Sequence, residues 1–514
     1  MLTNTTTRTP NDSSVLVRGQ SAFGQWQQEL WGQLYLTATI RNDGFSTFGV
    51  SDQRHWFPAA ALAWNFTNFT TLGGFASQGR LRAAYGETGT EPGAYLTNGY
   101  YSSGFFVSTW SDQLLASQNG QGGLFTATRK PQNNLNPERQ REFETGFDIG
   151  FLRDRADASF TYYDREADDV IFDLPLPSTT GYSVQASNAG RIRNTGIEAS
   201  LNVRALQATN YDWDLGFQYS HNRNKVLELR GAEAVDLPTG GFFTGTLVSA
   251  VRGHPIGSFR SYDFVRCRYG EANAVDIDGS GTATDINALC QSARMPNGAM
   301  YIGADGFPVE DPTQRVIGDP NPSWTGSVRT GIRYRKLNVT GLLDIRRGGK
   351  VWNGTKGALV NFGTHSATAQ RADCSYNADD ELVCTGNERI FGTNFMNGNV
   401  FGPGVGTAVP IGENWYTGLG SGFGNVASQF LEDGSFVKLR EVSVGYTFDT
   451  GWVRRLRLSS VDVRLAGRNL VTWTNYDGID PETNLGGAQV AAQGIDYFNN
   501  PQTRSFVITF GLNR

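Results

Sequence analysis

One polar segment, DIDGSGTATDIN at residues 276–287, has the spacing of a calcium-binding loop. Acidic or hydroxyl side chains recur at every second position before Gly281, as the first oxygen ligands of an EF-hand do. The candidate oxygen ligands are Asp276, Asp278, Ser280, the carbonyl of Thr282, Thr284 and Asp285. An EF-hand would also need flanking amphipathic helices and a bidentate Glu at position twelve, where this chain has Asn287. The pattern therefore argues against a calcium sensor.

Two interpretations of this loop remain open. In the first, a structural calcium ion is held weakly, in the roughly millimolar range of extracellular modules, and orders a long loop. In the second, the segment is a polar turn that binds no metal. Neither interpretation involves catalysis.

The four cysteines occur as two local pairs, each flanking a polar loop. Cys267 is paired with Cys290 by position, and Cys374 with Cys384. Four cysteines allow three connectivities, but this grouping favours two local disulfides and an oxidising compartment. The alternative is four unpaired thiols.

Catalytic motifs are absent from the sequence. The four histidines, His55, His221, His254 and His365, show no H-E-x-x-H spacing, and no G-x-S-x-G or phosphate-binding loop occurs. The segment GFGNVA at residues 422–427 matches a dinucleotide fingerprint but lacks the strand before it and the helix after it. The net charge of −5 and the pI near 5.6 give no basic field for nucleic acid. We therefore expect neither an enzyme nor a nucleic-acid-binding protein.

Aromatic side chains in the long polar segments form a further candidate site. They are Tyr95, Tyr100, Tyr101, Phe105, Phe106, Trp110, Trp352, Trp415 and Tyr416. Such rings can stack on sugars or on apolar peptide side chains, and loops on a rigid scaffold often carry function. Alternatively, the rings pack the loops against each other or against a partner.

Period-two alternation of apolar and polar side chains dominates the rest of the chain. In GIEASLNVRA, residues 196–205, apolar side chains stand at the odd positions and polar ones at the even positions from 197 onwards. No apolar run approaches the roughly 18–20 residues of a membrane-spanning helix. A content of 39% hydrophobic residues with 63 glycines suits strands that have one apolar and one polar face. The pattern predicts an all-β protein.

Short and long connections between these strands alternate along the chain. We expect short turns near residues 31–33, 68–74, 153–156, 207–209, 334–336 and 450–456, and longer connections at residues 42–55, 90–139, 174–191, 231–319, 348–429 and 475–503. Alternation gathers the long connections at one end of the strands, as in outer-membrane barrels with short periplasmic turns and long extracellular loops.

These features predict a transmembrane antiparallel up-and-down β-barrel. We expect about 13 strands, beginning near Ser14 and ending at Asn513. Several expected strands reach the roughly 9–11 residues that a tilted membrane strand needs, whereas strands of a soluble β-protein, the alternative, average about five or six.

Seven segments in a fixed order point to a family. They are YLTATIRNDGFSTFG from Tyr35, FPAAALAWNF from Phe57, LNPERQREFETGFDIGF from Leu135, TTGYSVQASNAGRIRNTGIEASLN from Thr179, VIGDPNPSW from Val316, FVKLREVSVGYTF from Phe436 and LAGRNLVTWTNYDGIDPE from Leu465. Each is a modest motif alone, but the ordered set is specific. The sequence resembles the C-terminal barrel portion of the SusC/RagA-like family of TonB-dependent outer-membrane transporters.

The resemblance implies that the barrel is incomplete in residues 1–514. Family members have a plug, a TonB box and 22 strands, of which this chain would supply only the later part. The polar N-terminus lacks the apolar core of a secretory signal, and bacterial barrels have even strand numbers, so both observations agree with missing early elements.

The resemblance also implies a location, partners and a function. The chain would lie in outer-membrane lipid, with a SusD-like surface lipoprotein over its long loops and the TonB complex acting through the missing N-terminal part. The expected function is import of oligosaccharides, peptides or similar large nutrients, with no bond made or broken. A surface adhesion or protein-docking barrel is the alternative, and a passive porin is a third possibility.

Overall fold

The computed structural model describes most of the chain. The described residues are 15–48, 54–68, 76–103, 105–106, 114–115, 117–118, 121–122, 124–237, 246–393, 395–424, 426–487 and 493–514. Every structural statement below refers to these ranges.

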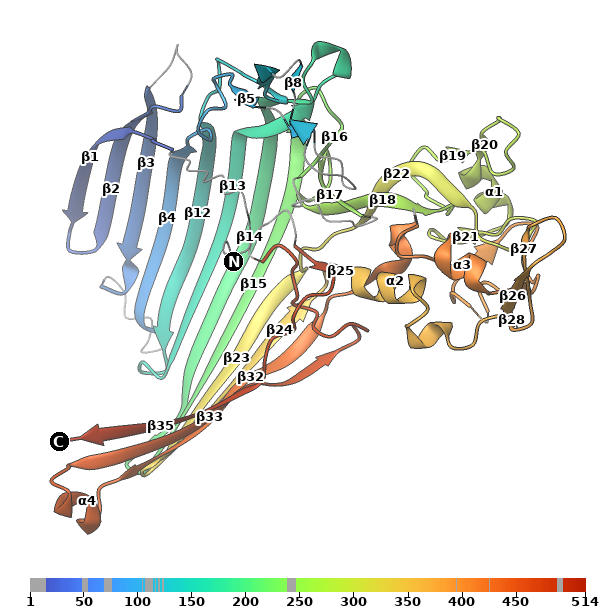
Figure 1. Ribbon diagram of the computed structural model, residues 1–514. Coiled ribbons are helices and arrows are strands. Elements are labelled where there is room, and N and C mark those ends of the chain that lie inside the picture. The colour runs from blue at the N-terminus through green and yellow to red at the C-terminus, as the bar shows by residue number, and fades with distance from the viewer. Residues whose placement is uncertain are drawn as a thin grey trace. The chain divides into compact units, whose positions relative to one another are not determined.

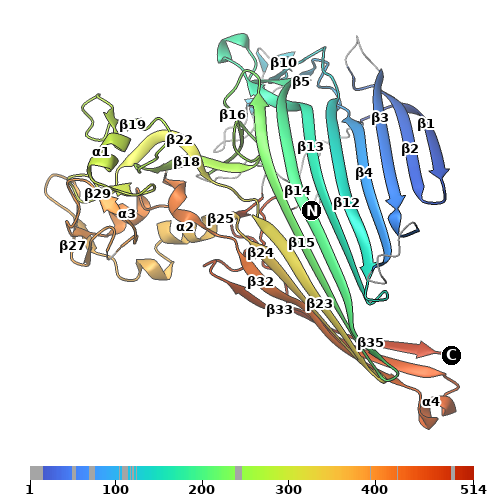
Figure 2. The ribbon, with the colours of Figure 1, turned by 180° about the vertical axis from the view of Figure 1, so that it is seen from behind.

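The main sheet of the described residues orders thirteen strands largely as they follow in the chain (Figures 1 and 2). They are β1 (Gly19–Leu30), β2 (Leu34–Phe45), β3 (Arg54–Asn65), β4 (Ala76–Thr90), β12 (Glu138–Phe151), β13 (Ala156–Pro175), β14 (Val184–Ala208), β15 (Tyr211–Leu229), β23 (Trp324–Tyr334), β24 (Leu337–Arg347), β32 (Phe436–Phe448), β33 (Ser460–Thr474) and β35 (Ser505–Asn513). The sheet is antiparallel along this path, and β11 (Arg129–Lys130) pairs in parallel with β14. The predicted all-β fold and the predicted number of strands are confirmed.

The connections alternate in length over most of the chain, but residues 449–459, expected as a short turn, are more numerous than residues 176–183, expected as part of a long connection. Short turns fall at residues 31–33, 152–155, 209–210, 335–336 and 449–459. The turn expected at residues 68–74 lies almost wholly outside the described residues. The long connection expected at residues 174–191 is shorter, because β13 continues to Pro175 and β14 begins at Val184. The polar run before Gly190 is therefore strand, not loop.

The two faces of the sheet differ in chemistry, as β12 illustrates. Phe143 and Phe147 are exposed on one face, and Phe147 stacks on Phe160 of β13. On the other face, Glu142 forms an ion pair with Arg165 at 3.0 Å. In a membrane barrel the apolar face contacts lipid and the polar face lines the interior.

The chain divides into two compact units. The first comprises Met1–Arg153, Phe160–Gly196 and Asn224–Val235. The second comprises Asp154–Ser159, Ile197–Arg223 and Asp236–Arg514. Small strands of the first unit are β5 (Tyr101–Ser103), β6 (Phe105–Phe106), β7 (Leu114–Leu115), β8 (Ser117–Gln118), β9 (Gln121–Gly122) and β10 (Leu124–Thr126), with η1 (Phe66–Asn68) and η2 (Ser178–Thr180).

Three long connections of the second unit, residues 246–323, 348–435 and 475–504, carry secondary structure of their own, and we call them the loop assembly (Figure 1). Its strands are β17 (Leu247–Val251), β18 (Ser258–Phe264), β19 (Ala274–Val275), β20 (Thr284–Asp285), β21 (Met300–Tyr301), β22 (Glu310–Gly318), β25 (Lys350–Asn353), β26 (Asp373–Tyr376), β27 (Leu382–Thr385), β28 (Glu388–Arg389), β29 (Val400–Phe401), β30 (Val409–Pro410), β31 (Leu431–Asp433) and β34 (Ile495–Asp496), and β16 (Ala234–Asp236) precedes them. Its helices are α1 (Ile286–Ser292), α2 (Gly354–Asn361), η3 (Ser366–Thr368), α3 (Glu413–Thr417) and η4 (Ala427–Phe430).

The remaining helix, α4 (Gly451–Arg455), lies in the turn between β32 and β33. None of the helices in the described ranges is both long and apolar enough to cross a membrane.

Candidate functional site

The loop assembly has a hydrophobic core that joins all three of its connections. Phe259 and Ile302 come from the first connection, Trp415 from the second and Ile495 from the third, and all four side chains are buried. The short sheet β31–β25–β34 also joins the second connection to the third. Burial of these side chains away from water stabilises the packed arrangement. The long loops are therefore a folded body and not separate flexible segments.

Three aromatic residues proposed as exposed contacts lie in this core, which corrects the expectation for them. The exposed fractions of Trp352, Trp415 and Tyr416 are only 1%, 4% and 5%. Trp415 packs against Phe391 with ring centroids 5.1 Å apart and stacks on Phe307 at 5.8 Å. These rings pack the loops against one another, because residues distant in the sequence close over them.

The hydroxyl of Tyr416 is hydrogen-bonded inside the loop assembly. It donates a hydrogen bond to the carbonyl oxygen of Ala367 at 3.1 Å. Burial raises the pKa of the Tyr416 hydroxyl, so the ring stays neutral. A buried, neutral and hydrogen-bonded tyrosine fits a structural role.

The other predicted aromatic contacts belong to the first unit. Tyr95, Tyr100 and Tyr101 are exposed, and Tyr101 is 69% exposed in β5. Trp110 lies outside the described residues. The three tyrosines remain candidates for contact with a substrate or partner.

Both local cysteine pairs are disulfide bonds. Cys267 is bonded to Cys290, and Cys374 to Cys384. The first bond joins the segment that follows β18 to helix α1. It lies inside a small hydrophobic core with Val275 and Ile286. The second crosses the hairpin formed by β26 and β27.

The calcium-like loop is an exposed turn closed by β19 and β20. The Asp276 carboxylate accepts a hydrogen bond from the Gly281 N–H at 2.8 Å, and the Asp278 carboxylate accepts one from the Ser280 N–H at 3.1 Å. Hydrogen bonds from Ser280 lower the pKa of Asp278. Gly281 has a φ of 81°, a conformation that glycine adopts without steric cost.

The remaining predicted ligands are only partly placed around this turn. The carboxylate of Asp285 instead caps α1 by accepting a hydrogen bond from the Ala288 N–H at 3.2 Å. Thr284 pairs with Val275 in the β19–β20 ladder, while Thr282 donates its N–H to the Ser280 hydroxyl oxygen at 3.3 Å. The described residues contain no group of three or more His, Cys, Asp or Glu side chains placed to share a metal ion. The calcium site stays a prediction.

A buried network of charges ties the third connection to the main strands, and the sequence reasoning missed it. Lys438 of β32 is 2% exposed, and its Nζ donates to the carboxylates of Asp480, at 2.7 Å, and Glu482. Arg440 binds Glu482 and, at 2.7 Å, Asp344 of β24. The network joins β24 and β32 to residues 480–482.

The basic side chains of the FVKLRE motif thus pair with the acidic side chains of the GIDPE motif. The Asp480 carboxylate also accepts hydrogen bonds from the Glu482 N–H at 3.0 Å and the Gln502 N–H at 3.2 Å. Burial alone would raise the pKa values of Asp480 and Glu482, but hydrogen bonds from Lys438 to both carboxylates, and from Arg440 to Glu482, outweigh it and lower both. Lys438 itself was the sequence signal for this network. It stands between apolar residues in an expected strand, and a buried cation needs a negatively charged partner.

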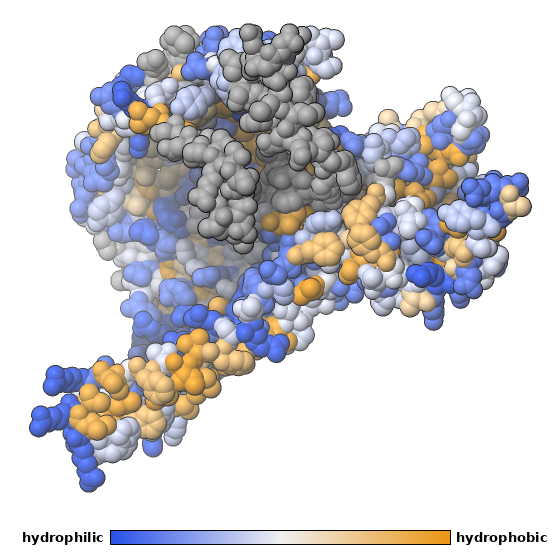
Figure 3. All heavy atoms as spheres, in the orientation of Figure 1, coloured by the Kyte–Doolittle hydropathy of each residue, from blue (hydrophilic) through white to orange (hydrophobic). Residues whose placement is uncertain are grey.

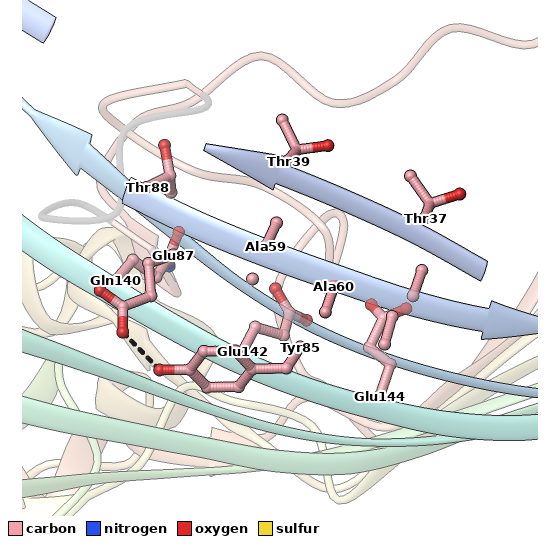
Figure 4. Close-up of a pocket in the computed structure, with 13 residues that line it drawn as sticks. Thr37, Thr39, Ala59, Ala60, Tyr85, Glu87, Thr88, Gln140, Glu142 and Glu144 are labelled. Atoms are coloured by element: carbon pink, nitrogen blue, oxygen red, sulfur yellow. Dashed lines mark hydrogen bonds between the residues drawn. The ribbon is translucent and has the colours of Figure 1, made fainter. Parts of the chain in front are cut away.

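The first unit has a hollow on the polar face of β2, β3, β4 and β12 (Figure 4). Its volume is about 410 Å³. Small side chains, Ala59, Ala61 and Ala84, face Glu142 and Glu144 across paired strands. The hollow therefore combines small apolar side chains with carboxylates.

Comparison with known proteins defines the class of protein. Residues 2–470 match the family described as TonB dependent receptor-like, beta-barrel, so the chain belongs to this family. Its fold and sequence are SusC/RagA-like, and it is an outer-membrane protein. The family consists of transport receptors and not of enzymes.

Two curated receptors are similar to this chain along nearly all of its length. The chain is similar to TonB-dependent receptor P3 of Formosa agariphila, with 27% identity over 507 residues that cover 96% of this chain and 45% of the receptor. It is also similar to TonB-dependent receptor SusC of Bacteroides thetaiotaomicron, with 23% identity covering 96% of this chain and 43% of that protein. The chain thus spans less than half the length of these relatives.

A solved structure shows the same fold. The RagAB peptide importer in its closed-closed state aligns with a TM-score of 0.66 and 20% identity, covering 96% of this chain and 47% of the compared chain. The RagAB importer in its open-open state aligns with a TM-score of 0.64.

Proposed function

We propose that this chain is the C-terminal barrel part of a TonB-dependent importer for large nutrients. The strand edges support the proposal, since β1 pairs only with β2 and β35 only with β33 among the described strands. An edge strand presents unpaired backbone N–H and C=O groups, which can pair with a further strand. Preceding strands in the whole protein would complete a 22-strand barrel, with a plug and a TonB box ahead of them.

The packed loop assembly is the observation that carries the proposal. It combines a hydrophobic core shared by its three connections, two disulfides and an anchoring charge network at the long-loop ends of outer-membrane strands. A pre-organised surface loses little conformational entropy when a partner binds. We infer that a SusD-like surface lipoprotein docks on it and delivers substrate.

Import on this account is conformational gating. Residues 480–482 are held to β24 and β32 by Lys438 and Arg440, so the third connection has a fixed attachment to the main strands. TonB would supply energy by pulling on the plug, and no bond in the nutrient is broken. Because similar solved structures are described as a peptide importer, peptides are the first substrate class to test and oligosaccharides the second.

The test uses the full-length receptor in its own outer membrane. Affinity purification should recover a SusD-like lipoprotein in near-equal amount. Deletion of the receptor and inactivation of TonB should abolish uptake of the same labelled peptide or oligosaccharide. Recovery of no lipoprotein, together with uptake that survives both deletions, would reject the proposal.

An adhesion or protein-docking barrel is the second candidate, because the folded loop assembly would serve it equally well. Binding of a surface partner would then persist without TonB, and no plug or TonB box would precede the strands. A passive porin would also lack these elements but would pass small solutes without TonB.

A further inference from the structure

The turn that contains α4 has an unusual surface for a short connection. Val453 is buried and α4 contacts β33, while the Val453 N–H donates to the carbonyl oxygen of Thr450 within the same turn at 3.0 Å. Trp452 and Leu456, one helical turn apart, are 49% and 62% exposed. The helix therefore has one buried attachment and two large exposed apolar side chains.

This apolar surface continues the lipid-facing surface of the strands. Trp452 lies 6.0 Å from Phe448, and Phe448 lies 4.7 Å from Tyr446, measured between ring centroids. Tyr446 is exposed on β32, and Phe510 of β35 is exposed on the same sheet. In Figure 3 the strands that lead to this end show hydrophobic surface, with hydrophilic residues gathered toward the tip.

Basic side chains adjoin the exposed rings. Arg454, Arg455 and Arg457 are all exposed, and none forms an ion pair with a carboxylate in the described part of the chain. The nearby carboxylate of Asp449 is already paired with Lys336 from the next turn. The α4 turn thus has an excess of positive charge next to aromatic side chains.

We propose that the α4 turn binds anionic phospholipid headgroups in the periplasmic leaflet of the outer membrane. Aromatic residues favour the membrane–water interface, where Trp452 would sit with Leu456 at the boundary of the acyl chains. Guanidinium groups of Arg454, Arg455 and Arg457 suit phosphate, which they bind through paired N–H donors. The short turns of outer-membrane barrels lie on the periplasmic side. The proposal requires the outer-membrane location and the orientation that places the short turns in the periplasm, but it does not require import.

The experiment places a fluorophore beside the arginines of the full-length receptor in lipid nanodiscs. All four cysteines of this chain are in disulfides, so Leu456→Cys can be labelled selectively with a bimane once any free cysteine elsewhere in the full-length receptor is replaced by serine. Brominated phosphatidylglycerol should quench the label at least about twofold more than brominated phosphatidylcholine, because each nearby arginine attracts anionic lipid. The preference should disappear in Arg454→Gln/Arg455→Gln/Arg457→Gln.

A matched control neutralises three exposed loop arginines that also lack ion pairs in the described part. The variant Arg252→Gln/Arg294→Gln/Arg371→Gln should keep the full preference, and Arg454→Lys/Arg455→Lys/Arg457→Lys should keep most of it. Raising the salt concentration to about 0.5 M should weaken the preference in the receptor with all three arginines.

Equal quenching by the two lipids before any arginine is changed would overturn the proposal. An unchanged preference in the glutamine variant, or an equal loss in the loop control, would do the same. If the glutamine variant does not reach the membrane, a preference unaffected by salt would be the contradicting result.

Discussion

Lys438 holds two carboxylates of the third connection while almost fully removed from water. Its Nζ lies 2.7 Å from Asp480 and also contacts Glu482. Removing one partner of a buried ion pair leaves the other charge uncompensated, which costs more than the pair itself contributes. The network is therefore sensitive to loss of the lysine.

We predict that Lys438→Met lowers the free energy of unfolding by about 3–5 kcal/mol. The matched control is Arg468→Met, which breaks the exposed ion pair with Glu441 and should cost about 1 kcal/mol or less. Unfolding of the purified receptor can be followed by its heat-modifiable migration on gels. Equal midpoints for the two variants would contradict a buried structural network.

The same network should make attachment of the third connection sensitive to acid. The pKa values of Asp480 and Glu482 are lower in the folded protein than in the unfolded chain. Their contribution to stability is therefore complete above the unfolded values, near pH 4, and is lost as the pH falls through the folded values. Hydrogen exchange across residues 475–487 should accelerate below about pH 4. Exchange that is unchanged down to pH 3, or that accelerates between pH 8 and 6, would contradict this sign.

The calcium prediction can be tested at the level of single carboxylates. Calorimetric titration of the intact transporter with calcium should release heat with a dissociation constant near the millimolar range. Asp276→Ala/Asp278→Ala should abolish that heat. Identical heats from both proteins would discard the site and leave a polar turn held by its own hydrogen bonds.

At the level of elements, each of the two disulfides fastens one segment of the loop assembly. Their sequence separations are 10 and 23 residues. Closing loops of these sizes restricts the unfolded chain and stabilises the folded segment by about 3 kcal/mol in the chain-entropy model.

We predict that Cys374→Ser/Cys384→Ser exposes its hairpin to proteases. Cleavage should concentrate between β26 and β27, whose tip residues Asp379 and Asp380 are exposed. The main strands should stay intact, since the hairpin does not pair with them. Limited proteolysis with mass spectrometry checks this, and a cleavage pattern identical to that of the oxidised receptor would contradict it.

The strands and turns were predictable because their signals are local. Alternation marks each strand, and turn residues such as Gly32 and Arg335 interrupt it. The core of the loop assembly was not predictable in this way. Trp352 and Trp415 stand in glycine-rich polar sequence, and only contacts between distant connections bury them.

The two segments that form the charge network could be recognised in the sequence, but their contact could not. FVKLRE and GIDPE were recognisable as separate motifs, but no local pattern shows that Lys438 meets Asp480. The paired cysteines were easier, because each pair is close in sequence and flanks one polar loop.

For the whole molecule, both proposals require one orientation in the membrane. The loop assembly must face the outside of the cell, where a lipoprotein could dock. The α4 turn must face the periplasm, where it could meet phospholipid headgroups. All long connections join the same strand ends, so a single orientation decides the placement of every one of them.

Surface labelling of intact cells tests this orientation most directly. Val405→Cys is exposed in the loop assembly, and Thr209→Cys is exposed in the turn between β14 and β15. A membrane-impermeant maleimide should label position 405 in intact cells and position 209 only after the outer membrane is opened. Labelling of position 209 in intact cells, with position 405 protected, would contradict the account.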